Sequence, residues 1–266
     1  MDARAETAAD FEAAWQLWQD ARWRLVAGPH GIAALADTVW LSADDRAVHG
    51  VVGRWRADGD AVVGTGLEGS GYERTDGTPV ADAVTLHAGE TLRAGAGLVR
   101  AFVREGVPAL RRIDPHTERR VRLQSIAAWR PDPEWVVEAH WMPRDEPIEV
   151  EQVDGHRTTQ GGAGTLEFTL LGERRTLTAT RGEGELAIVF RDATGDDDAY
   201  PFRFLRPPLP DDAGRTTLDF NRSFLPPCAF SDHYVCPMPP PGNRLDIAVT
   251  AGERRPVLRA EGAEAE

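Results

Sequence analysis

The chain contains no lysine, because all 30 of its basic residues are arginine. This absence excludes a Schiff-base lysine and the lysine of a phosphate-binding P-loop. The glycine-rich stretch GTGLEGSG (residues 64–71) lies among predicted strands and opens no helix, and no G-x-S-x-G motif occurs. Neither a Rossmann dinucleotide site nor a serine nucleophile elbow is therefore predicted.

Long apolar runs are also absent. No segment approaches the roughly 18 consecutive apolar residues of a membrane-spanning helix, and the acidic N-terminus lacks the charged-then-apolar order of a secretory signal. We therefore expect a soluble, cytoplasmic protein with no membrane partner. The net charge is −13, with acidic residues spread along the chain. Binding to nucleic acid needs clustered positive charge and is not expected.

The 266 residues include 26 glycines and 19 prolines, which favour many turns. From residue 48 onward, short runs rich in Val, Ile, Leu, Thr and Phe alternate with Gly, Asp and Pro clusters, a pattern typical of antiparallel strands. The clearest hairpin is TLEFTLLGERRTLTAT (residues 165–180). In it Leu166, Phe168 and Leu170 alternate with polar residues before a predicted turn at Gly172-Glu173.

An amphipathic helix is predicted over residues 1–28. Its proposed docking face recurs at helical spacing and stops at Gly28-Pro29; the face comprises Phe11, Trp15, Trp18, Arg22 and Leu25. We predict a mainly β protein, an antiparallel β-sandwich or open barrel-like fold with this N-terminal helix. Residues 29–266 are expected to form a single β-rich domain, with a weak proline-marked break near residues 131–147 between two subdomains.

The segment DFNRSFLPPCAFSDHYVCPMPPPGNR (residues 219–244) is rigid and polar, and it concentrates the candidate site residues. If TTLDFN is a strand, Asp219 and Asn221 share one face. Arg222 and Arg244 stand at the two ends of the proline-rich loop, where two guanidiniums can clamp a carboxylate or phosphate. The alternative is that nearby aspartates pair with both arginines and pin an irregular loop. Both interpretations remain open at the level of sequence.

A second polar segment, FRDATGDDDAYPFRFL (residues 190–205), alternates acidic residues like the start of a calcium loop. The twelfth position from Asp192 is Arg203 where such loops need a bidentate Glu, so calcium is not predicted. A solvated turn is the better interpretation. Tyr200 and Arg203 are candidates to face the same cleft as Arg222, which would make the site cationic in an acidic protein.

Cys228 and Cys236 are the only cysteines. Two buried thiols that pack beside prolines are the default interpretation in a reducing compartment. A disulfide, a zinc site with His233 and a nucleophilic Cys228 are alternatives that the spacing alone does not exclude. The seven histidines form no metal-binding cluster. No metal is predicted, and no motif names a cofactor or an oligomeric state.

Together these segments resemble the domain of unknown function 1684 family of bacterial and archaeal proteins. The resemblance runs from the N-terminal helix to the AGE motif near residue 253 and is most specific in its C-terminal motifs: Asp219 to Arg222, Pro226 to Cys228, Cys236-Pro237 and Asn243 to Leu245. The chain departs from the family pattern at Ser223-Phe224-Leu225, and again at Ala199-Tyr200 and Phe202-Arg203. The resemblance implies no established activity.

Our leading hypothesis is a small-molecule site for an anionic or polar ligand, with hydrolysis as a candidate reaction, where the proline-rich loop folds over one sheet face. Arg222 and Arg244 would hold the anion, Asn221 and Asn243 would orient it, and Asp219 would act as a base or counterion. The competing hypothesis is a non-catalytic β scaffold or protein-interaction module whose loop is purely structural. A third is redox sensing through the thiol pair.

Overall fold

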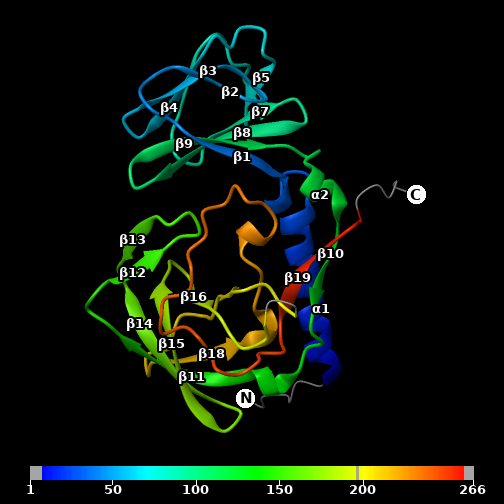
Figure 1. Ribbon diagram of the computed structural model, residues 1–266, viewed down its shortest axis with the longest axis vertical. Helices are drawn as coiled ribbons and strands as arrows, with labels where there is room; N and C mark the ends of the chain where they lie inside the picture. Colours follow the sequence, from blue (N-terminus) through cyan, green and yellow to red (C-terminus); the bar gives the residue numbers. More distant parts are fainter. Residues whose placement is uncertain (1–7, 196–197, 261–266) are drawn as a thin grey trace. The chain divides into compact units, whose positions relative to one another are not determined.

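A computed structural model describes residues 8–195 and 198–260, which form antiparallel β-sheets after an N-terminal helix (Figure 1). The predicted fold class is confirmed. The chain divides into two compact units. The first comprises Met1–Trp23, Gln124–Ala229 and Val235–Leu258; the second comprises Arg24–Leu123, Phe230–Tyr234 and Arg259–Glu266. The predicted break near residues 131–147 lies inside the first unit.

The N-terminal helix α1 spans Ala8–Ala27 and ends directly before Gly28-Pro29, as predicted. Its first predicted residues, 1–7, lie outside the described part of the chain. The predicted docking face is only partly right, because Leu25 is 56% exposed. Arg22 is buried, and its charge is compensated because both its Nε and its Nη2 donate to the carboxylate of Glu253.

The first unit is built on a six-stranded sheet, with two smaller two-stranded sheets. The large sheet has the order β17 (Arg203–Leu205), β16 (Leu186–Phe190), β15 (Glu173–Arg181), β14 (Ala163–Leu170), β11 (Val136–Pro143) and β18 (Arg215–Asp219). β12 (Ile148–Glu151) pairs with β13 (Arg157–Gln160), and β10 (Leu123–Ala128) with β19 (Glu253–Leu258). Three short 3-10 helices complete it: η2 (Pro133–Trp135), η3 (Phe220–Arg222) and η4 (Pro227–Ala229).

One face of the large sheet forms the core of this unit. Alternating residues of β14, including Leu166, Phe168 and Leu170, are buried there with Leu177 of β15. Phe220 lies at the centre, with the rings of Trp135, Phe168 and Phe190 packed around it. Because side chains alternate along a strand, every second residue of β15 and β16 faces away from this core.

The predicted hairpin is present as β14 and β15, which pair from Ala163↔Thr180 to Leu170↔Glu173. Its turn consists of Leu171 and Gly172, one residue earlier than predicted. Both have positive φ, 51° and 82°, as a two-residue hairpin turn that matches the twist of the strands requires. Glu173 therefore belongs to the strand.

The second unit contains a five-stranded and a four-stranded sheet. The larger has the order β1 (Leu35–Trp40), β9 (Val107–Ile113), β8 (Gly97–Arg104), β7 (Thr91–Ala94) and β5 (Tyr72–Arg74). The smaller has the order β2 (Arg46–Val48), β3 (Val51–Asp58), β4 (Ala61–Thr65) and β6 (Val84–Leu86). The unit also contains η1 (Ile32–Ala34) and α2 (Glu118–Arg122).

Both sheets of the second unit contribute to one core. Trp55 of β3 is fully buried in it together with Leu86 and Leu110. Its cross-strand neighbour must be glycine, because a Cβ at Gly64 would lie 2.6 Å from the Trp55 ring. The two sheets share their apolar faces, which is the sandwich arrangement expected from the sequence.

Candidate functional site

The candidate site begins where β16 leaves the sheet of the first unit. Leu186, Ile188 and Phe190 point into the core, and the next residues, Arg191 and Asp192, enter a polar turn. The Asp192 carboxylate accepts hydrogen bonds from the backbone N–H of Thr194 at 2.9 Å and from its hydroxyl at 2.6 Å. This local bonding is the usual reason for aspartate in such turns.

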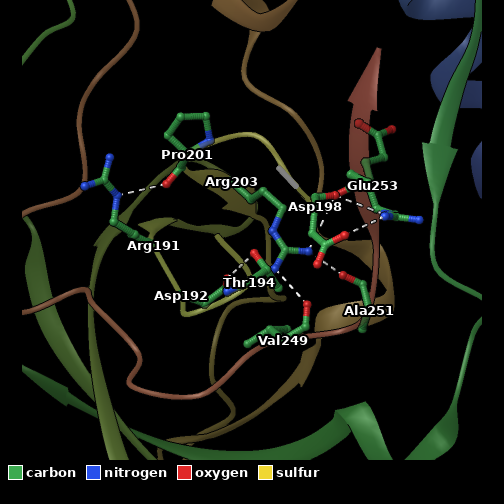
Figure 2. A network of polar contacts seen from close by, with 10 residues as sticks. Arg191, Asp192, Thr194, Asp198, Pro201, Arg203, Val249, Ala251 and Glu253 are labelled. Atoms are coloured by element: carbon green, nitrogen blue, oxygen red, sulfur yellow. Dashed lines mark hydrogen bonds and ion pairs between the residues drawn. The ribbon is translucent and has the colours of Figure 1, made fainter. Parts of the chain in front are cut away.

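Arg203 lies at the centre of the network that Figure 2 shows. It opens β17, opposite Phe190 of β16. Its guanidinium donates to the Asp192 carboxylate and to the carbonyl oxygens of Val249 and Ala251. The Asp192 and Arg203 side chains are only 3% and 2% exposed. Arg203 therefore bonds the segment before β19 to the sheet, while its charge is paired with Asp192.

The environment of Arg203 is apolar apart from these acceptors. Its guanidinium carbon lies 5.0 Å from the Trp129 ring centroid and 5.3 Å from that of Phe190. Burial lowers the pKa of Arg203 below its ordinary value, while the charge of Asp192 and its hydrogen bond oppose that shift. Asp192 and Arg203 thus neutralise each other, and neither charge is offered to a ligand.

A cavity of about 360 Å³ lies beside this ion pair. Its lining comprises Arg191, Asp192, Ala193, Thr194, Gly195, Tyr200, Pro201 and Arg244. Arg191 and Arg244 are partners in a parallel β-bridge, so their side chains leave the backbone on the same side. Arg191 is held by its Nε, which donates to the Pro201 carbonyl at 2.9 Å (Figure 2). Two arginines from distant parts of the sequence therefore line one cavity.

Asn243 holds Arg244 in this position. Its buried side chain accepts from the Thr178 N–H at 2.7 Å and donates to the carbonyls of Thr178 and Val189 at 2.7 and 2.8 Å. The Asn243 carbonyl accepts from the Arg191 N–H at 2.9 Å. The side-chain amide, predicted to orient a ligand, is thus bonded to the backbone of two strands and fixes the end of the proline-rich loop.

Asp219, Asn221 and Arg222 form a separate cluster. β18 ends at Asp219, and Phe220–Arg222 turn into η3, so the predicted strand through Asn221 is corrected. Asp219 and Asn221 still meet, because the Asp219 carboxylate accepts from both the backbone N–H and the side-chain amide of Asn221, at 3.1 and 3.0 Å. The other carboxylate oxygen pairs with Arg222 at 3.1 Å.

The buried Asn221 also bonds across the unit to Asp132, accepting from its N–H and donating to its carbonyl, both at 2.9 Å. Arg222 is 48% exposed at its side chain. Of the two arginines predicted to clamp an anion, Arg222 therefore has a carboxylate partner beside it in sequence, whereas Arg244 lies with Arg191 at the cavity. Arg191 was not among the predicted site residues, although it directly follows an alternating strand, which was a usable signal.

Both cysteines are buried thiols. The structure brings them together, since the Cys228 N–H donates to the Cys236 sulfur at 3.2 Å. Tyr200 connects them to the cavity, because its hydroxyl donates to the Cys228 sulfur at 3.6 Å. Tyr200 therefore lines the cavity with its ring while its hydroxyl is engaged elsewhere.

A second buried ion pair was not foreseen from the sequence. Arg22 of α1 and Glu253 of the AGE motif meet at 2.8 Å, and the Glu253 carboxylate also accepts the Leu225 N–H at 2.8 Å. Among residues 8–195 and 198–260, no group of three or more His, Cys, Asp or Glu side chains is placed to hold a metal ion. No helix in that same part of the chain is long and apolar enough to cross a membrane.

Comparison with known proteins places this site within a family. The chain is similar over 49% of its length to an uncharacterized protein of Haloarcula marismortui, known from a solution NMR structure; the identity is 35%, 76% of that chain is covered and the TM-score is 0.42. No curated protein matches. The family model described as protein of unknown function (DUF1684) matches residues 122–254, a range that holds both asparagine anchors, both thiols and the Asp192–Arg203 pair. The chain therefore belongs to the DUF1684 family.

Proposed function

We propose that the protein binds a small molecule through a carboxylate or phosphate group at the cavity between Arg191 and Arg244. The observation that carries this proposal is the bridge pairing of the two arginines beside a cavity of about 360 Å³. Like charges on directly paired residues repel each other. An oxyanion between the two guanidiniums removes that repulsion and accepts charge-assisted hydrogen bonds from both.

The charge balance of the lining supports an anion. Among the described lining residues Asp192 is the one carboxylate, and its charge is already compensated by the buried Arg203. Within this described part of the lining, Arg191 and Arg244 therefore add positive charge, in a chain of net charge −13. Arg244 also borders a neighbouring cavity, where the carboxylates of Glu167 and Asp246 are paired with Arg174 and Arg175.

The two arginines are also preorganised. The Pro201 carbonyl restrains the Arg191 side chain, and three side-chain hydrogen bonds of Asn243 restrain the backbone that carries Arg244. Restraint before binding reduces the entropy lost on binding. In this proposal Asn243 and Arg203 are positioning residues, and Tyr200 contributes a wall of the cavity.

Asp219, Asn221 and Arg222 have no part in the proposed anion site. Their hydrogen bonds with one another and with Asp132 support a capping and anchoring role. Hydrolysis with Asp219 as the base stays a prediction. The bonding of both asparagines to backbone groups favours the second candidate, a structural scaffold, for this part of the loop.

The test is calorimetric unfolding of the wild type and of Arg244→Gln in phosphate, in citrate and in sodium chloride of matched ionic strength. A ligand that prefers the folded state stabilises it by about 2.7 kcal/mol at about 100 times its Kd. We expect phosphate or citrate to raise the unfolding temperature of the wild type and not of Arg244→Gln. Arg93→Gln, which removes an exposed arginine from the second unit, is the matched control and should respond like the wild type.

Two results would contradict the proposal. Equal stabilisation of wild type and Arg244→Gln would place any bound anion elsewhere. No stabilisation of the wild type by phosphate or citrate, relative to chloride, would leave the scaffold as the function of this segment.

A further inference from the structure

We propose a second, independent binding site on the outer face of β15 and β16, for a short amphiphile with an apolar tail and an anionic head. A cavity of about 280 Å³ lies there, close to the lower end of the roughly 300–1,000 Å³ range of ligand pockets.

The floor of this cavity follows from strand alternation. Leu177 and Ala179 of β15 point into the core, so Thr178 and Thr180 point to the other face. The same alternation places Ala187 and Val189 of β16 outward, while their neighbours Leu186 and Ile188 are in the core. Phe204 of β17 completes the floor. None of these floor side chains carries a charge.

The roof is formed by the β12–β13 hairpin and the proline-rich loop. Ile148, Val150 and Gln160 line it from the hairpin, and Pro237, Met238 and Pro240 line it from the loop. The loop is bonded to the hairpin, because the Met238 N–H donates to the Glu151 carbonyl at 2.7 Å. Prolines limit the motion of this roof. The loop therefore encloses an apolar space that the core does not fill.

The charged residues in the lining are both arginines, Arg181 and Arg206. Both are exposed. Arg206 meets Glu185 only at 3.7 Å, in a pair whose side chains are 40% and 52% exposed, and such surface pairs contribute little. An apolar interior with cationic groups at its border is complementary to a carboxylate on a short alkyl chain. A neutral chain would use neither guanidinium, and a bare anion would leave the apolar lining uncovered.

The experiment is isothermal titration of the full chain with octanoate, octanol and acetate. We expect octanoate to bind at least about tenfold more tightly than octanol, the usual effect of one charge-assisted hydrogen bond, and far more tightly than acetate, which lacks the apolar tail. Arg206→Gln should weaken the binding of octanoate and leave the binding of octanol unchanged. Ala187→Leu, which fills part of the floor, should weaken octanoate and octanol together. Arg93→Gln is the charge-matched control and should bind like the wild type.

The inference is overturned if octanoate does not bind, if octanol binds as tightly as octanoate, or if Ala187→Leu leaves the affinity for octanoate unchanged. Circular dichroism of each variant verifies folding. If Ala187→Leu does not fold, Thr180→Val is a second floor variant, which keeps the volume and the β-branched shape of the side chain. It removes one hydroxyl and should change the affinity for octanoate by less than Arg206→Gln does. Arg244→Gln should leave octanoate binding intact, and this result would distinguish the site from the cavity at Arg191 and Arg244.

Discussion

Replacing Asp192 with asparagine is the sharpest test of how the network beside the anion cavity is held together. The substitution keeps the side-chain shape and an oxygen that can accept from Thr194. It removes the charge opposite Arg203, whose other acceptors are neutral carbonyl oxygens. Both side chains of the pair are almost fully buried, so the guanidinium is left uncompensated. Breaking a buried pair in this way costs about 3–5 kcal/mol, a large part of the roughly 5–15 kcal/mol that stabilises a typical domain.

The assay is urea unfolding followed by tryptophan fluorescence, with Glu167→Gln as the matched control. Glu167 also pairs with an arginine, Arg174, but those side chains are 38% and 84% exposed, and exposed pairs contribute about 0–1 kcal/mol. Removing both partners, as in Asp192→Asn with Arg203→Met, should destabilise less than the sum of the single changes by about 2 kcal/mol. The reasoning is refuted if Asp192→Asn costs no more than Glu167→Gln, or if the two single effects simply add.

Three further predictions concern other parts of the chain. Asn243→Ala leaves three part-buried backbone groups without their side-chain partner. It should lower the free energy of unfolding by about 2–3 kcal/mol in urea titrations, and an effect under about 1 kcal/mol would contradict its anchoring role. Burial raises the pKa of the Tyr72 hydroxyl, and the hydrogen bond from the Val52 N–H opposes this. The folded state therefore keeps the Tyr72 proton above the unfolded pKa of about 10, and stability should fall as pH rises above about 10. Tyr72→Phe should flatten that decline. An unchanged pH profile would contradict the raised pKa of Tyr72. Because both cysteines are buried thiols, an aromatic disulfide reagent should label the pair slowly in native buffer and rapidly in denaturant. Rapid labelling in native buffer would contradict their burial.

Local patterns made much of the fold predictable. The β14–β15 hairpin follows from a two-residue alternation within one stretch of chain, and only its turn was displaced, because two consecutive residues adopt positive φ. The end of α1 follows from the glycine and proline that succeed it. The same local logic failed at Asn221, where a 3-10 turn capped by Asp219 replaces the expected strand.

The candidate site was less predictable because its contacts join distant residues. Asn243 bonds to backbone groups 65 and 54 positions earlier, and Arg22 meets Glu253 across 231 positions. Composition and spacing showed that residues 219–244 were unusually polar and rigid. Composition and spacing did not indicate which polar side chains would bond to backbone groups. They therefore could not show that Arg244 lies at the cavity and Arg222 does not, or identify Arg191.

The most direct measurement of the central claim is a crystal of the protein soaked in selenate, with anomalous diffraction recorded at the selenium edge. Selenate has the tetrahedral shape of phosphate and a signal that identifies its position. We predict an anomalous peak between the guanidinium groups of Arg191 and Arg244, and its loss in Arg244→Gln crystals. Peaks found only at other sites, with none between these two arginines, would contradict the proposal that this cavity binds an oxyanion.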